Sequence, residues 1–273
     1  MKTKRSIAGT IILLSWAVVS IWPIFYFATI ALRPRVEIIA PDPIYWPTFT
    51  TETWQKIWDE WPMVQYFLNS MGAVAGSVVI CLVLGIPAAY SLARYRYKGR
   101  EDIGNYILST KMMAPAVVAI PLFVLFAQFR MLDTVWALML VYAALNLSLV
   151  VWIIRSYMID IPHEIEDAAR TDGASDLRIL WEIIIPMCLP GIITAAVIAA
   201  IFGMNEFFLT LIIGRKEAFT MSIALANFKG GSDGIIYNAI ALVAFMAFFP
   251  VLLLVVAIQN HLSRGLTMGA VKG

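Results

Sequence analysis

Residues 166–175 read EDAARTDGAS, a short acidic and alanine-rich stretch that lies between two long apolar runs. Upstream, Pro162 suits the first turn of a helix, and the acids that follow it favour the positive end of a helix dipole. Asp172–Gly173 then offers a left-handed turn, because glycine adopts that geometry without a Cβ penalty. Four apolar residues at helical spacing come next, namely Leu177, Leu180, Trp181 and Ile184. We therefore predict a helix, a turn and a second helix in this segment.

The rest of the chain predicts a membrane around this segment. Of the 273 residues, 61% are hydrophobic and 14% charged, whereas soluble domains average about 45–50% and about 25%. Six separate apolar blocks are long enough to cross a hydrocarbon core of about 30 Å. They cover residues 7–32, 70–93, 103–129, 134–154, 186–213 and 235–260. The sequence predicts an all-α integral membrane protein with six transmembrane helices, the first of them too long for the apolar region of a signal peptide.

Basic residues orient these spans. Most of the 20 Lys and Arg residues fall in the segments that are cytoplasmic when the N-terminus is cytoplasmic. The densest cluster, ARYRYKGR at residues 93–100, occupies a short loop, where the positive-inside bias is most reliable. We expect both termini to face the cytoplasm, and likewise the segment around residues 166–175.

The charge of that segment indicates a protein partner. Between residues 162 and 185 the acids outnumber the bases, and the anionic cytoplasmic leaflet attracts basic segments, not acidic ones. We expect Ala168 and Ala169 to be exposed, which lets a partner's backbone come close. A solvated acidic linker is the alternative interpretation.

The same segment resembles the cytoplasmic EAA loop of ABC importer permeases, whose pattern is EAA, three residues, Gly, nine residues and I-x-L-P. Here 167–169 read DAA, Gly173 follows, and IIIP stands at 183–186. Asp167 replaces the first Glu and Ile185 replaces the Leu, which keeps the charge and the apolar character. FLNSM, MMAPAVVAIPLFVLF, NEFFLTLII and the ending RGLTMGAVKG are similar to carbohydrate-uptake permeases. The likeness extends over essentially the whole chain and is strongest to the smaller permease subunit of maltose-type importers.

This resemblance implies the type I ABC importer permease fold and a set of partners. The loop would be a coupling helix on a cytoplasmic ATPase dimer, which binds ATP and magnesium, while this chain binds no cofactor. The family places the ATPase-coupling positions at Glu164, Glu166, Asp167, Ala168, Ala169 and Gly173. The C-terminal tail would touch the same ATPase through Thr267, Gly269 and Lys272. A second, homologous permease subunit, an extracytoplasmic solute-binding protein and membrane lipid complete the expected partners, in a bacterial inner membrane.

Three regions follow from this interpretation. Residues 1–69 hold the first transmembrane helix and an extracytoplasmic loop. Residues 70–260 form the permease core with the cytoplasmic coupling loop at 155–185, and residues 261–273 form the tail. The extracytoplasmic loop carries Trp46, Trp54, Trp58 and Trp61, which suit either an interfacial anchor or a docking surface. Gly72 and Gly76 form a GxxxG pattern that predicts close helix packing.

Polar residues within the spans are few, so each is a candidate for a role in transport. We expect Lys111 to extend to the cytoplasmic surface from near the end of its span. Asn205 and Glu206 lie in the outer part of the fifth span, beside Gly203, where backbone can approach a ligand. We predict a substrate pathway along Asn205, Glu206, Phe207 and Phe208, because sugar hydroxyls pair with carboxylates and amides and sugar rings stack on aromatic faces. An interhelical hydrogen bond is the alternative role for the polar pair.

The sequence predicts a transport subunit and not an enzyme. No Gly-Lys pair occurs, so the chain cannot form a P-loop for ATP phosphates. We predict the permease subunit of an ATP-driven, binding-protein-dependent importer for a sugar, glycoside or polyol. The alternatives are an ion-coupled secondary transporter, an ABC permease for a non-sugar solute, and a membrane enzyme with a metal at Asp172 and Asp176. A net charge of +2 gives no indication of nucleic acid, and Cys81 and Cys188 are interpreted as small apolar residues.

Overall fold

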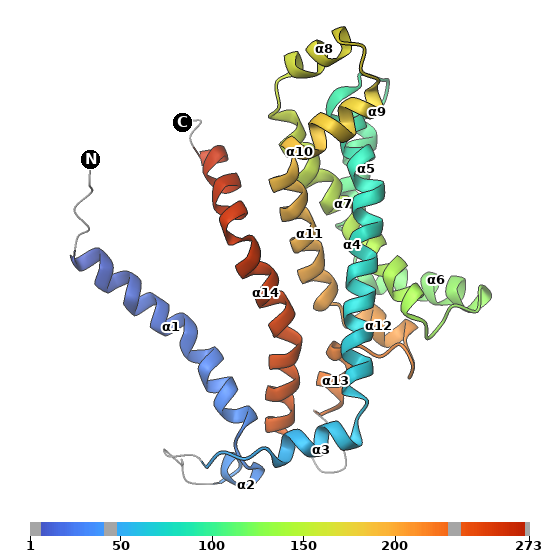
Figure 1. The fold of residues 1–273 in the computed structure, drawn as a ribbon. Helices are drawn as coiled ribbons and strands as arrows, with labels where there is room; N and C mark the ends of the chain where they lie inside the picture. Colours follow the sequence, from blue (N-terminus) through green and yellow to red (C-terminus); the bar gives the residue numbers. More distant parts are fainter. Residues whose placement is uncertain (1–6, 41–47, 229–235, 271–273) are drawn as a thin grey trace. The chain divides into compact units, whose positions relative to one another are not determined.

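The structure is a computed structural model that describes residues 7–40, 48–228 and 236–270. All regular structure in these residues is helical (Figure 1). The chain divides into two compact units, which are described separately. Unit 1 consists of Met1–Val64 and Ala224–Phe248, and unit 2 of Gln65–Ile223 and Phe249–Gly273.

Unit 1 contains α1 (Ile7–Ala31), α2 (Arg35–Ile38), α3 (Glu52–Glu60) and the beginning of α14 (Tyr237–Ala270). The candidate span Gly9–Ala31 of α1 is apolar along its length, and its most apolar 18-residue stretch has no buried residue. A helix that is apolar all round requires lipid or another subunit around it. The short α3 is amphipathic, with Ile57 buried and Trp54 largely exposed.

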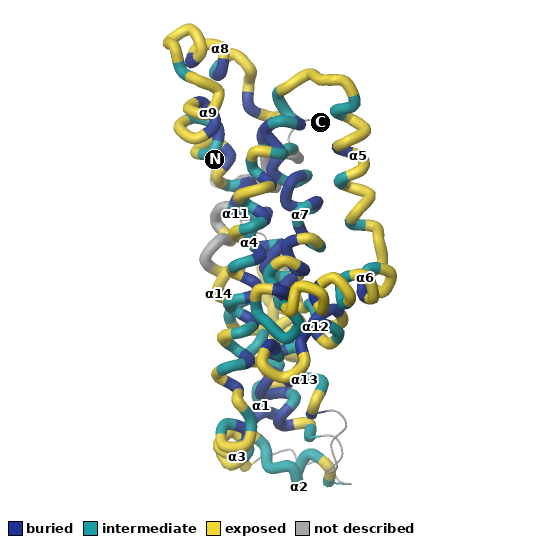
Figure 2. Tube along the Cα trace, turned by 90° about the vertical axis from the view of Figure 1, so that its right-hand side faces the viewer, coloured by how far each residue is buried: buried dark blue, intermediate teal, exposed yellow. Residues whose placement is uncertain are grey.

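Unit 2 is built around α7 (Val135–Ile159), the most buried of the candidate spans. Figure 2 shows buried residues along α7, whereas α5 is mostly exposed. The other elements are α4 (Met63–Arg94), α5 (Arg100–Thr110), α6 (Pro115–Gln128), α8 (His163–Thr171), α9 (Asp176–Ile179), a π-helix (Leu180–Ile184), α10 (Ile185–Met187), α11 (Leu189–Met204) and α12 (Phe208–Ile213). The boundary between the units falls within α13 (Met221–Asn227), whose residues from Ala224 on belong to unit 1. Helix α11 makes the most extensive helix–helix contact of the described residues, and it does so with α7.

Small residues on α4 allow the close approach of α7. A Cβ added at Gly76 would clash with the Met139 side chain, and one at Gly72 would lie 3.5 Å from Val135. The GxxxG pattern therefore has a structural role, and its partner is α7. Cys81 and Cys188 are both buried and free, as their apolar surroundings predicted.

Four of the predicted spans are continuous helices, and two are not. Among the described residues, four helices are long and apolar enough to cross a membrane: Gly9–Ala31, Met63–Arg94, Val135–Ile159 and Tyr237–Val256. These residues hold six candidate spans if each of two bent helix pairs counts as one span. The cytoplasmic position of the termini stays a prediction.

The third predicted span, residues 103–129, is not one continuous helix. It consists of α5 and α6, which meet at 90°. Pro115 forces the break, because a residue before proline avoids the α conformation. Ala114 accordingly has the extended angles φ −64° and ψ 132°.

The fifth predicted span is also interrupted. The helices over Asp176–Met187 and Leu189–Met204 meet at 76°, with Pro186 and Pro190 on either side of the bend. Helix α11 then ends at Met204, and α12 is a separate short helix. A bend next to closely spaced prolines is expected, since each proline removes a helical N–H donor.

Candidate functional site

The predicted helix–turn–helix is present. Helix α8 ends in a pair of hydrogen bonds, from Ala174 N–H to Ala169 O and from Gly173 N–H to Arg170 O, both 3.0 Å. Gly173 has φ +85°. This is the Schellman arrangement, in which a left-handed residue satisfies the last carbonyls of a helix. Ser175 then caps α9 by accepting a hydrogen bond from Arg178 N–H. The left-handed turn predicted at Gly173 is confirmed.

The second helix differs from the prediction in its apolar face. Leu180 and Ile184 are buried, but Leu177 and Trp181 are 71% and 66% exposed. The helix continues from α9 into a π-helix, whose wider turn changes which side chains share a face. The four residues therefore do not form one buried stripe.

Helix α8 has an outward and an inward face. Glu164, Asp167 and Ala168 are exposed, whereas Glu166 and Ala169 are 0% and 9% exposed. The expected exposure of Ala169 is wrong, because Glu166 and Ala169 stand three residues apart and so share the face that packs on the core. Ala169 belongs to the apolar cluster that includes Met158 on α7.

The inward face of α8 carries a buried ion pair. The Glu166 carboxylate pairs with the Arg94 guanidinium through Oε1 and Nε. Tyr90 Oη–H donates to Glu166 Oε2 at 3.1 Å, and Arg170 lies 3.6 Å from the same oxygen. Arg94 also donates to Ile161 O at 2.9 Å. The family-based role of Glu166 beside the docking surface does not fit this burial, since its carboxylate is enclosed by the chain itself.

The outward side of the same segment holds exposed ion pairs. Arg170 contacts Asp167 at 3.0 Å and Asp176 at 3.3 Å. Tyr95 Oη–H donates to Asp176 Oδ2 at 2.8 Å, and burial together with this hydrogen bond raises the pKa of Tyr95. Asp176, a metal ligand in the membrane-enzyme alternative, is thus already paired with Arg170 and hydrogen-bonded by Tyr95.

Lys111 does not extend to the membrane surface, so that prediction is wrong. Its Nζ donates to Leu145 O at 3.0 Å and to Asn146 Oδ1 at 3.3 Å, and it lies 4.6 Å from the centre of the Phe202 ring. The reason is its place just after α5, at the break before α6, where the side chain turns toward α7 and α11. A desolvated amine in a membrane protein gains from these carbonyl and ring partners.

The predicted substrate residues lie around another interruption of the fifth span, where α11 ends at Met204 and α12 begins at Phe208. Glu206 Oε1 accepts the Leu209 N–H at 2.9 Å, at the start of α12, and Asn205 Nδ2 donates to Ile201 O at 2.7 Å. Phe207 and Phe208 are exposed. Lys111 and Glu206 each lie at a helix break, the first at the end of α5 and the second between α11 and α12, which sequence spacing alone did not indicate.

The expectation that Gly203 leaves room for a ligand is wrong. Gly203 is buried, and a Cβ added there would lie 3.2 Å from the Val74 side chain. The missing side chain makes room for α4.

Asp133 is a structural residue that the sequence analysis missed. Its carboxylate accepts four backbone N–H groups, from Arg215, Lys216, Glu217 and Ala218, at 2.8–3.1 Å. Burial alone would raise the pKa of Asp133, but these four hydrogen bonds hold it below its usual value. Asp133 itself has φ +60°. It fixes the loop after α12, and only its position in a turn before α7 could have drawn attention to it.

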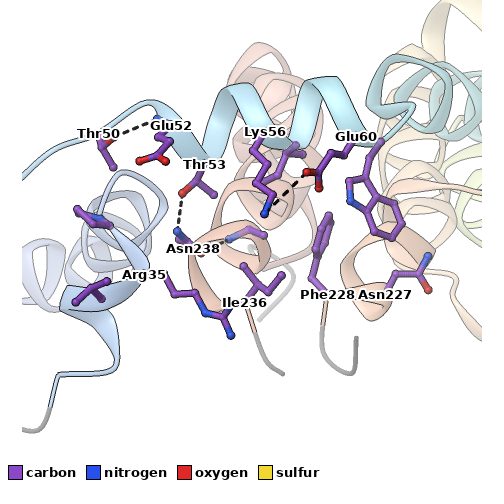
Figure 3. A pocket seen from close by; sticks show the side chains of 15 residues that line it. Arg35, Thr50, Glu52, Thr53, Lys56, Glu60, Asn227, Phe228, Ile236 and Asn238 are labelled. Carbon is purple, nitrogen blue, oxygen red and sulfur yellow. Dashed lines mark hydrogen bonds and ion pairs between the residues drawn. The ribbon is translucent and has the colours of Figure 1, made fainter. Parts of the chain in front are cut away.

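Unit 1 contains a pocket of about 410 Å³ with mixed polar and apolar walls. Figure 3 shows Lys56 and Glu60 from α3 facing Asn238 and Ile236 at the start of α14. Some of the polar groups that line it have partners within the unit: Lys56 lies 3.9 Å from Glu60, and Asn238 donates to Thr53 Oγ1 at 2.7 Å. Trp61 stacks against Phe228 with ring centroids 4.9 Å apart. Trp46 lies outside the described residues.

The predicted tail contacts cannot be placed. Lys272 lies outside the described residues. Thr267 and Gly269 lie on α14 by backbone, but their surroundings lie outside what is described.

Exposed apolar residues and four to six candidate spans among the described residues indicate a multi-pass helical membrane protein. Residues 82–268 match the family described as "Binding-protein-dependent transport system inner membrane component". Since this is well over half of the chain, the protein belongs to that family of ABC importer permeases.

Similar proteins support this membership. The trehalose transport system permease protein SugB of Mycobacterium tuberculosis is 30% identical over 253 residues, which covers 92% of each chain. The diacetylchitobiose uptake system permease protein DasC of Streptomyces coelicolor is 28% identical over 258 residues, which covers 93% of this chain and 92% of that protein. The sulfoquinovosyl glycerol transport system permease protein SmoH of Agrobacterium fabrum is 27% identical over 277 residues, which covers 100% of this chain and 94% of that protein.

Solved structures share the fold. A chain of a bacterial ABC transporter involved in the import of the acidic polysaccharide alginate superposes with a TM-score of 0.76 at 21% identity, covering 93% of this chain and 95% of that chain. A chain of the methionine ABC transporter MetNI superposes with a TM-score of 0.57 at 20% identity, covering 73% of this chain and 94% of that chain. The chain has the type I ABC importer permease fold.

Proposed function

We propose that this chain is one of two permease subunits of an ATP-driven, binding-protein-dependent importer for a sugar or glycoside in a bacterial inner membrane. The second subunit is a homologous permease, and an ATPase dimer on the cytoplasmic side binds ATP and magnesium. The observation that carries the proposal is α8, an acidic helix with an exposed face at one end of unit 2, in a chain whose relatives are named as sugar permeases.

The exposed face of α8 supports the coupling role. Asp167 and Ala168 lie on the outside of the helix, so a groove on the ATPase can receive a charge and, beside it, a side chain small enough for close approach. Glu164 extends this face toward the start of α8, and Gly173 sets its far end. The C-terminal residues Thr267, Gly269 and Lys272 add a second contact with the ATPase.

The transport path follows from the two helix breaks. Substrate and ion sites in transporters form where spanning helices are interrupted, because freed backbone and polar side chains can then face a ligand. Asn205, Glu206, Phe207 and Phe208 line the path at the α11–α12 break, and Lys111 lies at the α5–α6 break. A loaded binding protein docks on the extracytoplasmic loops, including the one that Asp133 fixes.

The proposal is tested by uptake into proteoliposomes that contain the chain together with its co-expressed permease and ATPase partners. Radiolabelled trehalose, diacetylchitobiose and sulfoquinovosyl glycerol serve as probes, each with its binding protein from the same genome. Uptake of at least one probe that requires ATP, and that stops without the binding protein, supports the proposal. Uptake driven by an ion gradient in the absence of ATP contradicts it.

A double variant, Asn205→Ala with Glu206→Gln, tests the substrate path. The amide oxygen that replaces the Glu206 carboxylate can still accept the Leu209 N–H, so α12 keeps its start. We expect uptake to fall about tenfold, since two ligand hydrogen bonds contribute roughly 0.5–1.5 kcal/mol each. ATPase co-purification should be unchanged. The path is elsewhere if uptake remains at the wild-type rate.

A further inference from the structure

Glu166 is the only charged residue of the described part of the chain that is buried as a whole, backbone and side chain together. A buried carboxylate that lacks compensation is costly, so its surroundings have to supply charge and hydrogen bonds. They come from a single neighbouring helix and from α8 itself: Arg94 and Tyr90 from α4, and Arg170 one turn along α8.

The Arg94 side of the pair is equally enclosed. Its side chain is 3% exposed, and that of Glu166 is 1% exposed. Arg94 Nε and Glu166 Oε1 face each other, and neither atom has another hydrogen-bond partner among the described residues. Arg94, the last residue of α4, also donates to Ile161 O. It therefore contacts both α8 and the segment that precedes α8.

This arrangement makes α8 and the end of α4 move together. Charges attract strongly where solvent is excluded, and separating the pair would leave two buried charges without partners. Apolar contacts of Ala169 add to the attachment but have no directional preference. A displacement of α8 therefore pulls on Arg94 of α4 through a buried charged contact, whereas the charged contact of α8 with Asp176 of α9 is exposed.

We infer that the Glu166–Arg94 pair, completed by Tyr90, is the joint that transmits movement of α8 to α4, and that Glu166 is a positioning residue which does not touch the ATPase. The inference rests on the proposed function. The two faces of α8 then have different roles: Asp167 and Ala168 bind the ATPase, and Glu166 transmits the movement of α8 to the membrane helices.

The test is the number of substrate molecules imported per ATP hydrolysed, measured in the reconstituted complex, together with ATPase co-purification. For Glu166→Gln we expect the ATPase to co-purify at the wild-type level while import per ATP falls about tenfold, within the usual range of coupling free energies. Glu182→Gln makes the same chemical change at an exposed acid of the π-helix and should leave the ratio unchanged.

A milder variant covers the case in which Glu166→Gln is not recovered from membranes. Tyr90→Phe removes only the hydroxyl that donates to Glu166, and it should lower import per ATP about threefold, as the loss of one hydrogen bond of roughly 0.5–1.5 kcal/mol would. Tyr95→Phe is its matched control, because its hydroxyl bonds to exposed Asp176 instead.

The outcomes separate this inference from the proposed function. If no ATPase co-purifies with the wild-type chain, the proposed function fails, independently of the result for the Glu166 variant. If wild type binds the ATPase but Glu166→Gln or Tyr90→Phe loses it, Glu166 belongs to the docking surface and the inference is overturned. A wild-type import ratio in the recovered variants overturns it as well.

Discussion

At the scale of single residues, burial decides what each acid of the EAA-type segment does. Glu166 and Asp167 are neighbours in sequence, yet one is enclosed with Arg94 and the other is exposed beside Arg170. Removing one partner of a buried pair costs about 3–5 kcal/mol, whereas an exposed pair contributes about 0–1 kcal/mol. Asp167 is therefore available to another protein at little cost to the fold, and Glu166 is not.

Gly173 is the residue whose backbone most directly sets the shape of the segment. A non-glycine residue in the left-handed region costs about 1–2 kcal/mol, and no atom lies within 4 Å of the Cβ that a substitution would add. Gly173→Val should therefore act through strain alone, changing how α8 ends. We expect reduced ATPase co-purification and reduced uptake.

Gly99 supplies the matched control for that substitution. It has φ +83° and equally open space around its missing Cβ, so Gly99→Val costs a similar strain in a different loop. It should lower thermal stability as Gly173→Val does but keep the ATPase bound. Equal loss of ATPase from both variants would show that general destabilisation, and not the turn after α8, is responsible.

At the scale of helices, the sequence was informative wherever a pattern was local. The start of α8 after Pro162 follows from proline and dipole preferences, and the turn at Gly173 follows from glycine geometry. Apolar length predicts the continuous helices α1, α4, α7 and α14. The bends were not predicted, although prolines lie beside them in the sequence. Pro87 and Pro250 lie inside continuous helices, so a proline within an apolar run does not by itself indicate whether the span bends.

The contacts between distant elements were the part that the sequence could not supply. Arg94 and Glu166 lie on separate helices far apart in the chain, Lys111 and Asn146 are separated by 35 positions, and Asp133 and Ala218 by 85. No pattern within one segment indicates such pairs. They decide, however, that Glu166 faces inward, that Lys111 turns into the protein, and that the loop after α12 is held in place.

At the scale of the whole molecule, we propose that the chain transmits energy that an ATPase partner releases. Its helices provide a surface on α8, charged groups at two helix breaks and a buried link between α8 and α4. Family membership and fold establish a membrane component of a binding-protein-dependent transport system. The coupling to an ATPase through α8 is the central claim that joins these parts.

Site-directed crosslinking in intact cells tests that claim most directly. Both native cysteines are buried, so a cysteine introduced at exposed Ala168 can be modified selectively with a reagent that then captures lysines of a neighbouring protein. We expect Ala168→Cys to capture an ATPase subunit and Ala169→Cys, on the buried face, to capture far less. Absence of an ATPase adduct at Ala168, or equal capture at both positions, would contradict the account.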